Sequence, residues 1–239
     1  MSLKFLNINK SYSGKTIYKD FCMEFSEGTI SCILGPSGCG KTTLLNIIGG
    51  IEAPDGGSME GFEGKKLSYI FQEPRLLPWK TVKENIEFVL DCSSKGEKMS
   101  AADREAEADM LIKKVELQDF ANYYPAKLSG GMKQRVSIAR AFTVNSNIVL
   151  MDEPLNGLDI NLKHNMLQWF SQLWQKDRRT VIFVTHDVDD ALMLGSDIYL
   201  FSKAPVQVIM HQHINEPIAE RDFESQNMIA LKNKIRNLL

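Results

Sequence analysis

Apolar and polar residues alternate along the start of the chain, a pattern that is typical of half-buried β-strands. Residues Leu3–Ile8 show this alternation, and Phe21, Met23 and Phe25 show it again. Turn-forming residues lie between the two segments, at 11–14. The pattern therefore predicts two neighbouring strands that pair in an antiparallel manner.

Later segments are apolar almost without interruption, as expected for strands that are buried on both faces of a parallel sheet. Buried strands are expected at Thr29–Leu34, Leu67–Phe71, Asn147–Met151, Thr180–Thr185 and Asp197–Phe201. Helices are expected at Lys41–Ile48, Asn161–Gln175, Val188–Leu194 and Ser225–Leu239. This alternation of strands and helices predicts an α/β fold with a mostly parallel sheet and an N-terminal antiparallel β subdomain.

Residues 80–142 have a helical character and interrupt this alternation. Within them, residues 95–109 are charged and rich in alanine and glutamate, which predicts an exposed helix with Glu105 and Asp109 on one solvated face. We expect a single domain over 1–239, with a core and β subdomain at 1–79 and 143–205, an inserted helical subdomain at 80–142 and a short C-terminal extension at 206–239.

The composition is that of a globular protein, with 44% hydrophobic and 24% charged residues in a chain of 239. A formal net charge of −2 gives no support to a protein that binds nucleic acid or membranes through bulk positive charge. No apolar run approaches the length of about 18 residues that a membrane span needs. We therefore expect no membrane-spanning helix, no signal peptide and no nucleic acid among the partners.

The cysteines and histidines show no spacing that is typical of a zinc site. The cysteines are Cys22, Cys32, Cys39 and Cys92. They form no CxxC pair, so we expect reduced thiols. His211 and His213 alternate as in a strand, and we expect them to lie on a solvated face.

Residues Gly35–Thr42 match the pattern G-x-x-x-x-G-K-[ST], in which backbone N–H groups of a glycine-rich loop surround phosphates. A predicted strand precedes the loop and a predicted helix follows it, as this motif requires. In such a site Lys41 reaches the β- and γ-phosphates, the Thr42 hydroxyl binds Mg²⁺, and Thr43 adds a phosphate contact. The candidate nucleotide-binding residues of the loop are Gly35, Pro36, Ser37, Gly38, Cys39, Gly40, Lys41, Thr42 and Thr43. Because Cys39 lies inside the loop, we expect bulky thiol reagents to block nucleotide binding.

Two acidic residues, Asp152 and Glu153, directly follow the strand predicted at 147–151. The carboxyl ends of parallel strands form the edge at which ligands bind in open α/β sheets. Asp152 is suited to hold Mg²⁺ through water, and Glu153 is suited to orient or deprotonate an attacking water. The alternative is a pair of acids that merely ends a strand, which the phosphate loop makes less favourable.

The segment Leu128-Ser-Gly-Gly-Met-Lys-Gln-Arg135 resembles the signature motif of ABC-type ATPases. The other motifs of that family follow in the family's order: Gln72 after a predicted strand, the signature, the acidic pair Asp152 and Glu153, Leu155–Asp159, and His186 within Val-Thr-His-Asp. The resemblance covers about residues 1–205 and implies a P-loop NTPase core with ATP and Mg²⁺ as cofactors.

In this family two nucleotide-binding subunits face each other head to tail, and each ATP lies between one subunit's phosphate loop and the other's signature. The resemblance therefore implies that Ser129, Gly130 and Gly131 contact the γ-phosphate of the ATP that the partner holds. The residues support this independently, because Ser-Gly-Gly ahead of a helix at 132–142 makes a second anion-binding helix N-terminus. The alternative is an ordinary serine-capped helix start.

The family pattern also implies roles for single residues. Gln72 contacts Mg²⁺ or the attacking water, His186 contacts the γ-phosphate, and Asp159 lies at the dimer contact. Tyr12 is expected to stack on adenine, with Tyr18 as a nearby competing candidate. The candidate catalytic residues are thus Glu153, His186, Gln72 and Lys41, and the candidate metal-binding residues are Thr42, Gln72 and Asp152.

The segment Phe71-Gln-Glu-Pro-Arg-Leu-Leu-Pro-Trp79 resembles the pattern of the nitrate, sulfonate and taurine importer group, which also contains importers of thiamine precursors. Leu76, Leu77 and Trp79 lie either in a groove that receives a permease helix or in the local core. The resemblance implies an ATP-hydrolysing subunit at the cytoplasmic face of the cell membrane. Its partners would be a second ATP-binding subunit, most simply a second copy, an integral-membrane permease and, indirectly, an extracytoplasmic solute-binding protein.

Two other functional classes stay open. Soluble ABC ATPases that act on ribosomes or DNA usually carry two cassettes or a long coiled-coil insertion, and this chain shows one cassette and no sustained heptads. A nucleotide-gated module that does not hydrolyse ATP is disfavoured by Glu153 and His186. The chain departs from the family at Asn156-Gly157, where the pair is often Ser-Ala, and this leaves the details of the dimer contact open.

Overall fold

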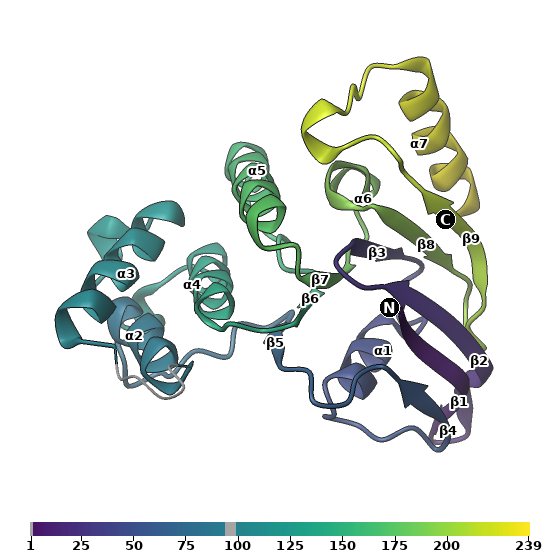
Figure 1. The fold of residues 1–239 in the computed structure, drawn as a ribbon, viewed down its shortest axis with the longest axis horizontal. Coiled ribbons are helices and arrows are strands. Elements are labelled where there is room, and N and C mark those ends of the chain that lie inside the picture. Colours follow the sequence, from purple (N-terminus) through teal and green to yellow (C-terminus); the bar gives the residue numbers. More distant parts are fainter. Residues whose placement is uncertain (1, 94–98) are drawn as a thin grey trace.

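A six-stranded sheet forms the centre of the computed structural model, which describes residues 2–93 and 99–239 (Figure 1). The order across the sheet is β5-β6-β7-β3-β8-β9. The strands are β3 (Ile30–Leu34), β5 (Leu67–Ile70), β6 (Ile148–Asp152), β7 (Thr180–Val184), β8 (Asp197–Phe201) and β9 (Val208–His213). Neighbouring strands are parallel, except that β9 is antiparallel to β8. The predicted α/β fold with a mostly parallel sheet is therefore confirmed.

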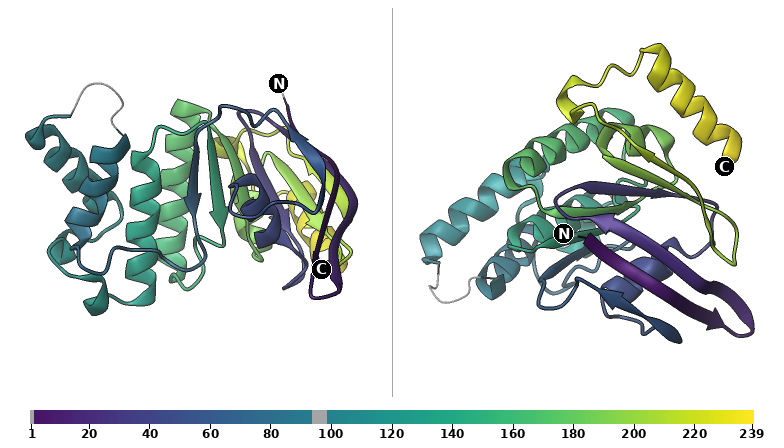
Figure 2. Two further views of the ribbon diagram at one scale, coloured as in Figure 1. Left: turned by 90° about the horizontal axis from the view of Figure 1, so that it is seen from below. Right: turned by 45° about the vertical axis from the view of Figure 1, so that its right-hand side comes forward.

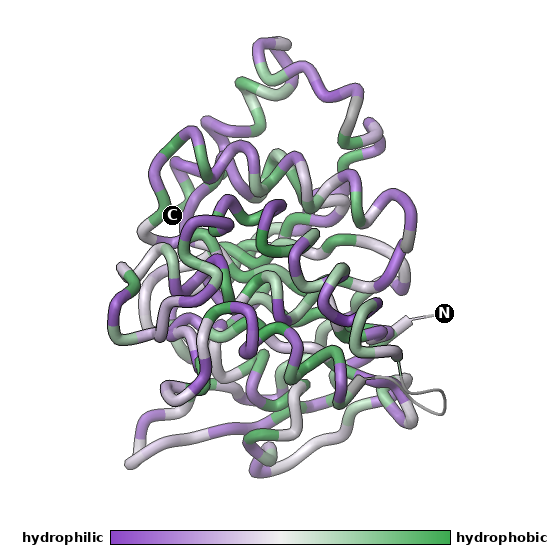
Figure 3. The backbone as a smooth tube through the Cα atoms, turned by 90° about the vertical axis from the view of Figure 1, so that its left-hand side faces the viewer, coloured by the Kyte–Doolittle hydropathy of each residue, from purple (hydrophilic) through white to green (hydrophobic). Residues whose placement is uncertain are grey.

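Both faces of this sheet are covered, which explains why its strands are apolar without interruption. Every residue of β3, β6, β7 and β8 is buried. Ile33 packs on one face in a cluster with helix α1 (Lys41–Ile48). Cys32 points to the other face and packs in a cluster with helices α5 (Ile160–Asp177) and α6 (Val188–Leu194). Figure 3 shows the hydrophobic segments gathered in the interior.

A second, antiparallel sheet has the order β2-β1-β4 and shares its apolar cluster with α1. Its strands are β1 (Ser2–Tyr12), β2 (Lys15–Ser26) and β4 (Gly56–Glu60). The predicted antiparallel pair corresponds to β1 and β2. Strand β4 is not evident from the sequence, because Gly-Gly-Ser-Met-Glu has weak strand propensity. Figure 2 shows this sheet at the side of the molecule opposite to the inserted helices.

The inserted region forms the helices α2 (Val82–Ser93), α3 (Ala101–Lys114) and α4 (Gly130–Thr143) (Figure 1). Glu105 and Asp109 share an exposed face of α3, as predicted, and both pair with Nζ of Lys83 on α2, at 2.7 and 3.0 Å. These ion pairs connect the two helices at their solvated side. Residues 95–98 of the helix predicted over 95–109 lie outside the described residues.

The C-terminal segment contributes the edge strand β9 to the central sheet and ends in α7 (Gln226–Leu238). His211 and His213 on β9 are exposed, as expected, but their side chains also make contacts that the sequence did not indicate. Both imidazoles bond to Oδ1 of the buried Asp197, at 2.9 and 3.0 Å, because the antiparallel register places His213 opposite Asp197. The ring of His211 also stacks on Tyr199. The two histidines therefore fasten the edge strand to β8.

Some further properties concern the described part of the chain as a whole. None of its helices combines the length and apolar character that crossing a bilayer demands. Within residues 2–93 and 99–239, the cysteines are free thiols. In the same residues, no group of three His, Cys, Asp or Glu side chains is placed to hold a metal ion by itself.

Candidate active site

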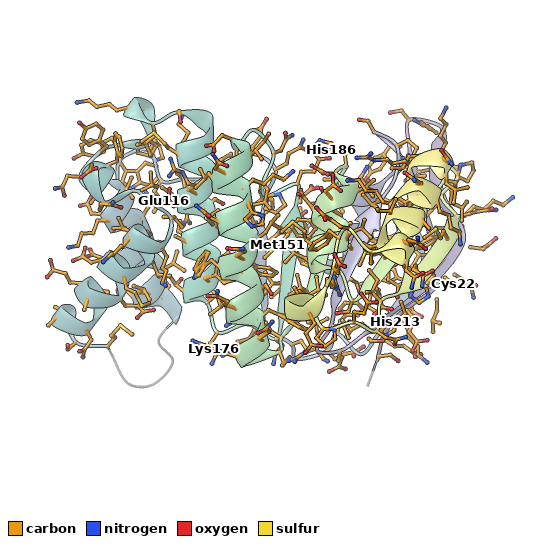
Figure 4. The ribbon with its side chains drawn as sticks, turned by 90° about the horizontal axis from the view of Figure 1, so that it is seen from above. Cys22, Glu116, Met151, Lys176, His186 and His213 are labelled. Atoms are coloured by element: carbon orange, nitrogen blue, oxygen red, sulfur yellow. The ribbon has the colours of Figure 1, made fainter. Side chains whose placement is uncertain are left out.

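The candidate site lies where three adjacent strands of the central sheet end. Strands β6, β7 and β3 are neighbours, and their C-terminal ends lead into Asp152, Thr185 and Gly35. The register brings these ends to one edge, because Val184 lies opposite both Asp152 and Ile33. Figure 4 shows His186 at this edge, far from His213 and Lys176 at the opposite end of the molecule. Ligands of open α/β sheets bind at such an edge.

The phosphate loop connects β3 to α1. The ammonium of Lys41 is nearly buried and donates hydrogen bonds to the carbonyl oxygens of Gly35 and Pro36, at 2.7 and 3.0 Å. Lys41 thus lies across its own loop, inside the ring of backbone groups that would surround a phosphate. Helix α1 begins after Gly40 without a side-chain cap and has no acidic residue in its first turn. Its first N–H groups are therefore available to an anion.

The β subdomain supports this loop from behind. Gly40 has φ 125°, and a Cβ atom there would lie 2.6 Å from Cγ2 of Ile17 on β2. Only glycine fits this position without displacing the strand. The hydroxyl of Tyr18 donates to the carbonyl oxygen of Gly40 at 2.8 Å, and its ring is fully buried. Tyr18 therefore supports the loop and has no exposed face for stacking on adenine.

Cys39 is the loop residue for which the structure overturns an expectation. Its side chain is 2% exposed, packed in the cluster formed by α1 and the antiparallel sheet. Burial also raises the pKa of the thiol and so disfavours the reactive thiolate. Bulky thiol reagents are therefore not expected to reach Cys39 in the folded protein.

Asp152 and Thr42 meet at the sheet edge although they lie far apart in the sequence. Asp152 is 2% exposed. Burial raises the pKa of its carboxyl, and the charge of Glu153 adds to this, whereas a hydrogen bond with the Thr42 hydroxyl and the charge of Lys41 oppose it. A hydroxyl beside a carboxylate fits Mg²⁺, which in phosphate sites takes one or two carboxylates and completes its shell with water and phosphate oxygens. The residues present therefore fit an ATP-bound Mg²⁺.

Glu153 turns away from the buried strand that carries Asp152. Its backbone has φ 45°, in the left-handed region that a glutamate adopts only where its surroundings impose it. Its N–H donates to the carbonyl oxygen of Val184 at 2.9 Å. Nδ1 of His186 lies 3.2 Å from Oε2 of Glu153, and the Asn156 amide donates to the same oxygen at 3.3 Å. Two side chains from different loops therefore hold this carboxylate at the edge of the site, and a third bond fixes the Glu153 backbone.

Two further predicted residues lie on the exposed side of the site. Gln72 is exposed, two residues beyond the end of β5, next to β6 at the same edge of the sheet. The side chain of Tyr12 is 40% exposed, and its hydroxyl bonds to Glu52 and contacts the hydroxyl of Thr43. Tyr12 thus lies beside the phosphate loop with an accessible ring, whereas Tyr18 does not.

The signature residues lie on the helical subdomain, away from α1 (Figure 1). The hydroxyl of Ser129 caps α4 by accepting a hydrogen bond from the N–H of Met132 at 3.3 Å. Ser129 and Gly130 are exposed, and a Cβ atom on Gly130 would meet nothing within 4 Å. Gly131 instead packs closely against Leu158. The structure therefore does not bring the signature together with the phosphate loop of the same chain.

Asp159 caps α5, because its carboxylate accepts a hydrogen bond from the N–H of Leu162 at 3.0 Å. The side chain of the next residue, Ile160, is 86% exposed. This structural role for Asp159 is compatible with the predicted dimer contact.

The sequence interpretation missed Asn156 as a contact of Glu153 and did not consider Lys163, which lies in the first turn of α5. The position of Asn156 beside the family's acidic pair was the only signal for it.

A strand, a phosphate loop and a helix, joined at the sheet edge by Asp152 and Glu153, define the class of P-loop NTPases. Within that class the chain belongs to the ABC transporter family, whose model matches residues 18–156.

Relatives and solved structures agree with this assignment over most of the chain. The chain is 34% identical to the taurine import ATP-binding protein TauB of Yersinia pestis bv. Antiqua (strain Antiqua), covering 93% of this chain and 87% of the relative. It is 40% identical to the aliphatic sulfonates import ATP-binding protein SsuB 2 of Pseudomonas syringae pv. tomato, covering 82% and 80%. It also resembles the dimeric structure of MJ0796, a bacterial ABC transporter cassette, with a TM-score of 0.81 and 32% identity over 90% of this chain and 99% of that one.

Proposed function

We propose that this chain is the ATP-hydrolysing subunit of a membrane importer for a small solute such as nitrate, a sulfonate, taurine or a thiamine precursor. The observation that carries the proposal is the convergence of Lys41, Thr42, Asp152, Glu153 and His186 at one edge of the sheet. The names of the relatives, which describe import of taurine and aliphatic sulfonates, support the importer branch and the solute class.

Binding of ATP uses groups that the loop already orients. The backbone N–H groups of the loop and of the start of α1 would surround the phosphates, and Lys41 would exchange its carbonyl contacts for phosphate oxygens. Tyr12 would stack on adenine beside Thr43. Thr42, Asp152 and Gln72 would hold Mg²⁺, which neutralises phosphate charge when it is bound.

Hydrolysis needs one residue that handles the attacking water and one that contacts the γ-phosphate. Glu153 orients the attacking water and accepts its proton. The bonds from His186 and Asn156 both fall on Oε2 of Glu153, which leaves Oε1 for the water. His186, more exposed than Glu153, is suited to contact the γ-phosphate from the same position. Catalysis is then mostly positioning and stabilisation of charge along an in-line transfer.

The proposed working unit is a dimer of two such subunits. The exposed Ser129 and Gly130, with Gly131 behind them, would complete the partner's site from the N-terminus of α4. The dimeric cassette among the structural neighbours supports this arrangement. ATP would then close the dimer by contacting both subunits, and hydrolysis would open it.

The dimer would act on an integral-membrane permease at the cytoplasmic face of the membrane, supplied with solute by an extracytoplasmic binding protein. Leu76 packs partly against the apolar core, and Leu77 is half-buried with its backbone bonded to Asn85. Trp79 is 69% exposed and is the candidate permease contact. No observation favours the alternative of a soluble ABC ATPase that acts on ribosomes or DNA.

The test is co-purification of the tagged chain from native membranes in mild detergent, with mass spectrometry of the bound proteins. A polytopic membrane protein in stoichiometric amount supports the proposal, and Trp79→Asp should lower its recovery while Phe223→Asp, an exposed aromatic on the C-terminal segment, should not. Ribosomal or DNA-associated proteins without a membrane partner would contradict the proposal.

A further inference from the structure

Lys163 joins the start of α5 to the loop that carries His186. Its N–H donates to the carbonyl oxygen of Asp159 at 2.9 Å, so it belongs to the first turn of the helix. Its ammonium lies 2.5 Å from Oδ2 of Asp187 and 2.8 Å from Oδ1 of Asp190, both beyond the end of β7. The Lys163 side chain therefore reaches from α5 to α6.

Asp187 is the residue next to His186, and its carboxylate is divided between two tasks. Oδ1 accepts a hydrogen bond from the N–H of Asp189 at 2.9 Å and so caps α6. Oδ2 is the atom that Lys163 holds. Because both oxygens are engaged from different elements, the backbone beside His186 is fixed relative to α5 as well as α6.

The titration properties of this cluster agree with a strong mutual interaction. Burial lowers the pKa of Lys163, but its bonds to Asp187 and Asp190 outweigh burial, so the pKa is raised. Burial likewise opposes ionisation of Asp187, yet the bond from Lys163 and the backbone N–H of Asp189 lower its pKa. Burial raises the pKa of Asp190. Without Lys163, two neighbouring carboxylates would face each other with no cation between them.

A cavity lies beside the ion pair between Lys163 and Asp187, so packing alone does not hold the His186 loop against α5. A cavity of about 200 Å³ lies between the segment around Asn156 and the loop around His186, and Glu153, Lys163 and Asp187 help to line it. Side-chain packing does not fill this space. Next to it, the ion pairs of Lys163 with Asp187 and Asp190 connect α5 to the loop that carries His186. On the opposite wall of the cavity, the side-chain amide of Asn156 donates a hydrogen bond to Glu153.

We propose that Lys163 is a positioning residue for ATP hydrolysis: by holding Asp187 it sets the place of the His186 imidazole. Lys163 also transmits the position of the α5 N-terminus, where Asp159 and the exposed Ile160 lie, to the catalytic loop. The inference rests on the proposed ATPase function and adds to it a residue that acts through Asp187. A shift of the segment 156–163, which leads into α5, would then move both catalytic side chains, Glu153 through Asn156 and His186 through Lys163.

The test compares Lys163→Met with Lys163→Arg and with the control Lys176→Met, an exposed lysine on the same helix that lies outside the cavity. Lys163→Met should lower kcat by about 10- to 100-fold, the cost of misplacing a catalytic group by about an ångström. KM for ATP should stay within about twofold, because the loop and Lys41 are untouched. Lys163→Arg should recover most of the activity, and Lys176→Met should match the unaltered protein.

A second variant keeps the test decisive if Lys163→Met is poorly folded. Asp187→Asn retains an oxygen that can cap α6 but weakens the bond to Lys163, so it should lower kcat and leave KM unchanged. Combined with Lys163→Met it should add little, because the two changes remove the same contact. Unchanged kcat in both single variants, with hydrolysis in the unaltered protein, would overturn the role of Lys163 alone. Absence of hydrolysis in the unaltered protein would instead overturn the proposed function.

Discussion

Asp152 and Glu153 are consecutive residues with opposite surroundings. Asp152 is the last residue of a buried strand and is 2% exposed. Glu153, with φ 45°, turns out of the strand and receives hydrogen bonds from His186 and Asn156. The different environments separate a group suited to hold a cation from a group suited to handle water.

Replacing Glu153 by glutamine tests the second role. The amide keeps the shape of the side chain but cannot accept the proton of water, so ATP turnover should fall by about 10²- to 10⁴-fold while ATP binding is retained. Steady-state hydrolysis and an equilibrium binding measurement separate the two effects. Glu60→Gln on the exposed strand β4 serves as the control, and undiminished hydrolysis by Glu153→Gln would remove Glu153 from the mechanism.

Replacing Asp152 by asparagine tests the first role through stability. Burial raises the pKa of Asp152 above its unfolded value, so the folded state holds the proton more tightly and stability falls as the pH rises through the interval between the two pKa values. Once the carboxyl is ionised in the folded state, Asp152→Asn should have a higher Tm than the unaltered protein without nucleotide. The difference should vanish below the unfolded pKa of about 3.9.

Thermal unfolding measured from about pH 3.5 to about pH 7 follows this effect, because carboxyl groups titrate within that range. Asp119→Asn, an exposed acid, should leave Tm unchanged, and both variants can be assayed for hydrolysis with Mg²⁺. Asp152→Asn should be inactive although it is more stable. A lower Tm for Asp152→Asn at pH 7 would mean that the carboxylate stabilises the fold instead of preparing the site.

Individual contacts were the part of the site that the sequence predicted least well. The motifs identified Lys41, Thr42 and Asp152 as neighbours, because each motif has a known place relative to a strand end. Burial of Cys39 could not be predicted, since it depends on the antiparallel sheet that packs behind the loop. The bond from Asn156 to Glu153 depends equally on the left-handed backbone of Glu153, which no local pattern indicates.

At the scale of elements, strand β2 determines the shape of the phosphate loop. Ile17 leaves no room for a side chain at position 40, and Tyr18 holds the carbonyl oxygen of Gly40. The loop is therefore formed by contacts with another subdomain as well as by its own glycines. Within the loop so shaped, the ammonium of Lys41 donates to the carbonyl oxygens of Gly35 and Pro36.

Gly40→Ala should therefore weaken ATP binding, because the new Cβ would lie 2.6 Å from Ile17 and the backbone has φ 125°. Strain of 1–3 kcal/mol at such a position corresponds to a rise in Kd of about tenfold or more. Gly64→Ala is the matched control, since Gly64 also has a positive φ but has no atom near its Cβ position and lies outside the site. Equal ATP affinity in the two variants, measured by titration calorimetry, would show that the loop tolerates the change.

The predictability of whole elements followed their burial. Every residue of strands β3, β6, β7 and β8 is buried, and continuous apolar runs in the sequence therefore predicted these strands. Strands β4 and β9 are edge strands with mixed exposure, and their pairing is decided by neighbours that are remote in the sequence. The sequence predicted the exposure of His211 and His213 but not their bonds to Asp197, which depend on the pairing of β9 with β8.

At the scale of the whole molecule, the phosphate loop and the signature belong to different subdomains. The loop lies between the central sheet and the antiparallel sheet, whereas Ser129 opens α4 in the inserted helical region (Figure 1). Each lies at the N-terminus of a helix, where backbone N–H groups and the helix dipole favour an anion. Two copies arranged with two-fold symmetry could complete two sites at once, one loop facing one signature in each.

Complementation between two inactive variants tests this account most directly. Lys41→Ala removes the phosphate contact of its own loop, and Ser129→Arg blocks the signature that serves the partner, so each variant alone should lack ATP hydrolysis. In a mixed dimer, the intact loop of Ser129→Arg faces the intact signature of Lys41→Ala. An equimolar mixture should therefore recover about a quarter of the unaltered activity, since half of the dimers are mixed and each has one complete site. A mixture as inactive as its components would contradict a site shared between two subunits.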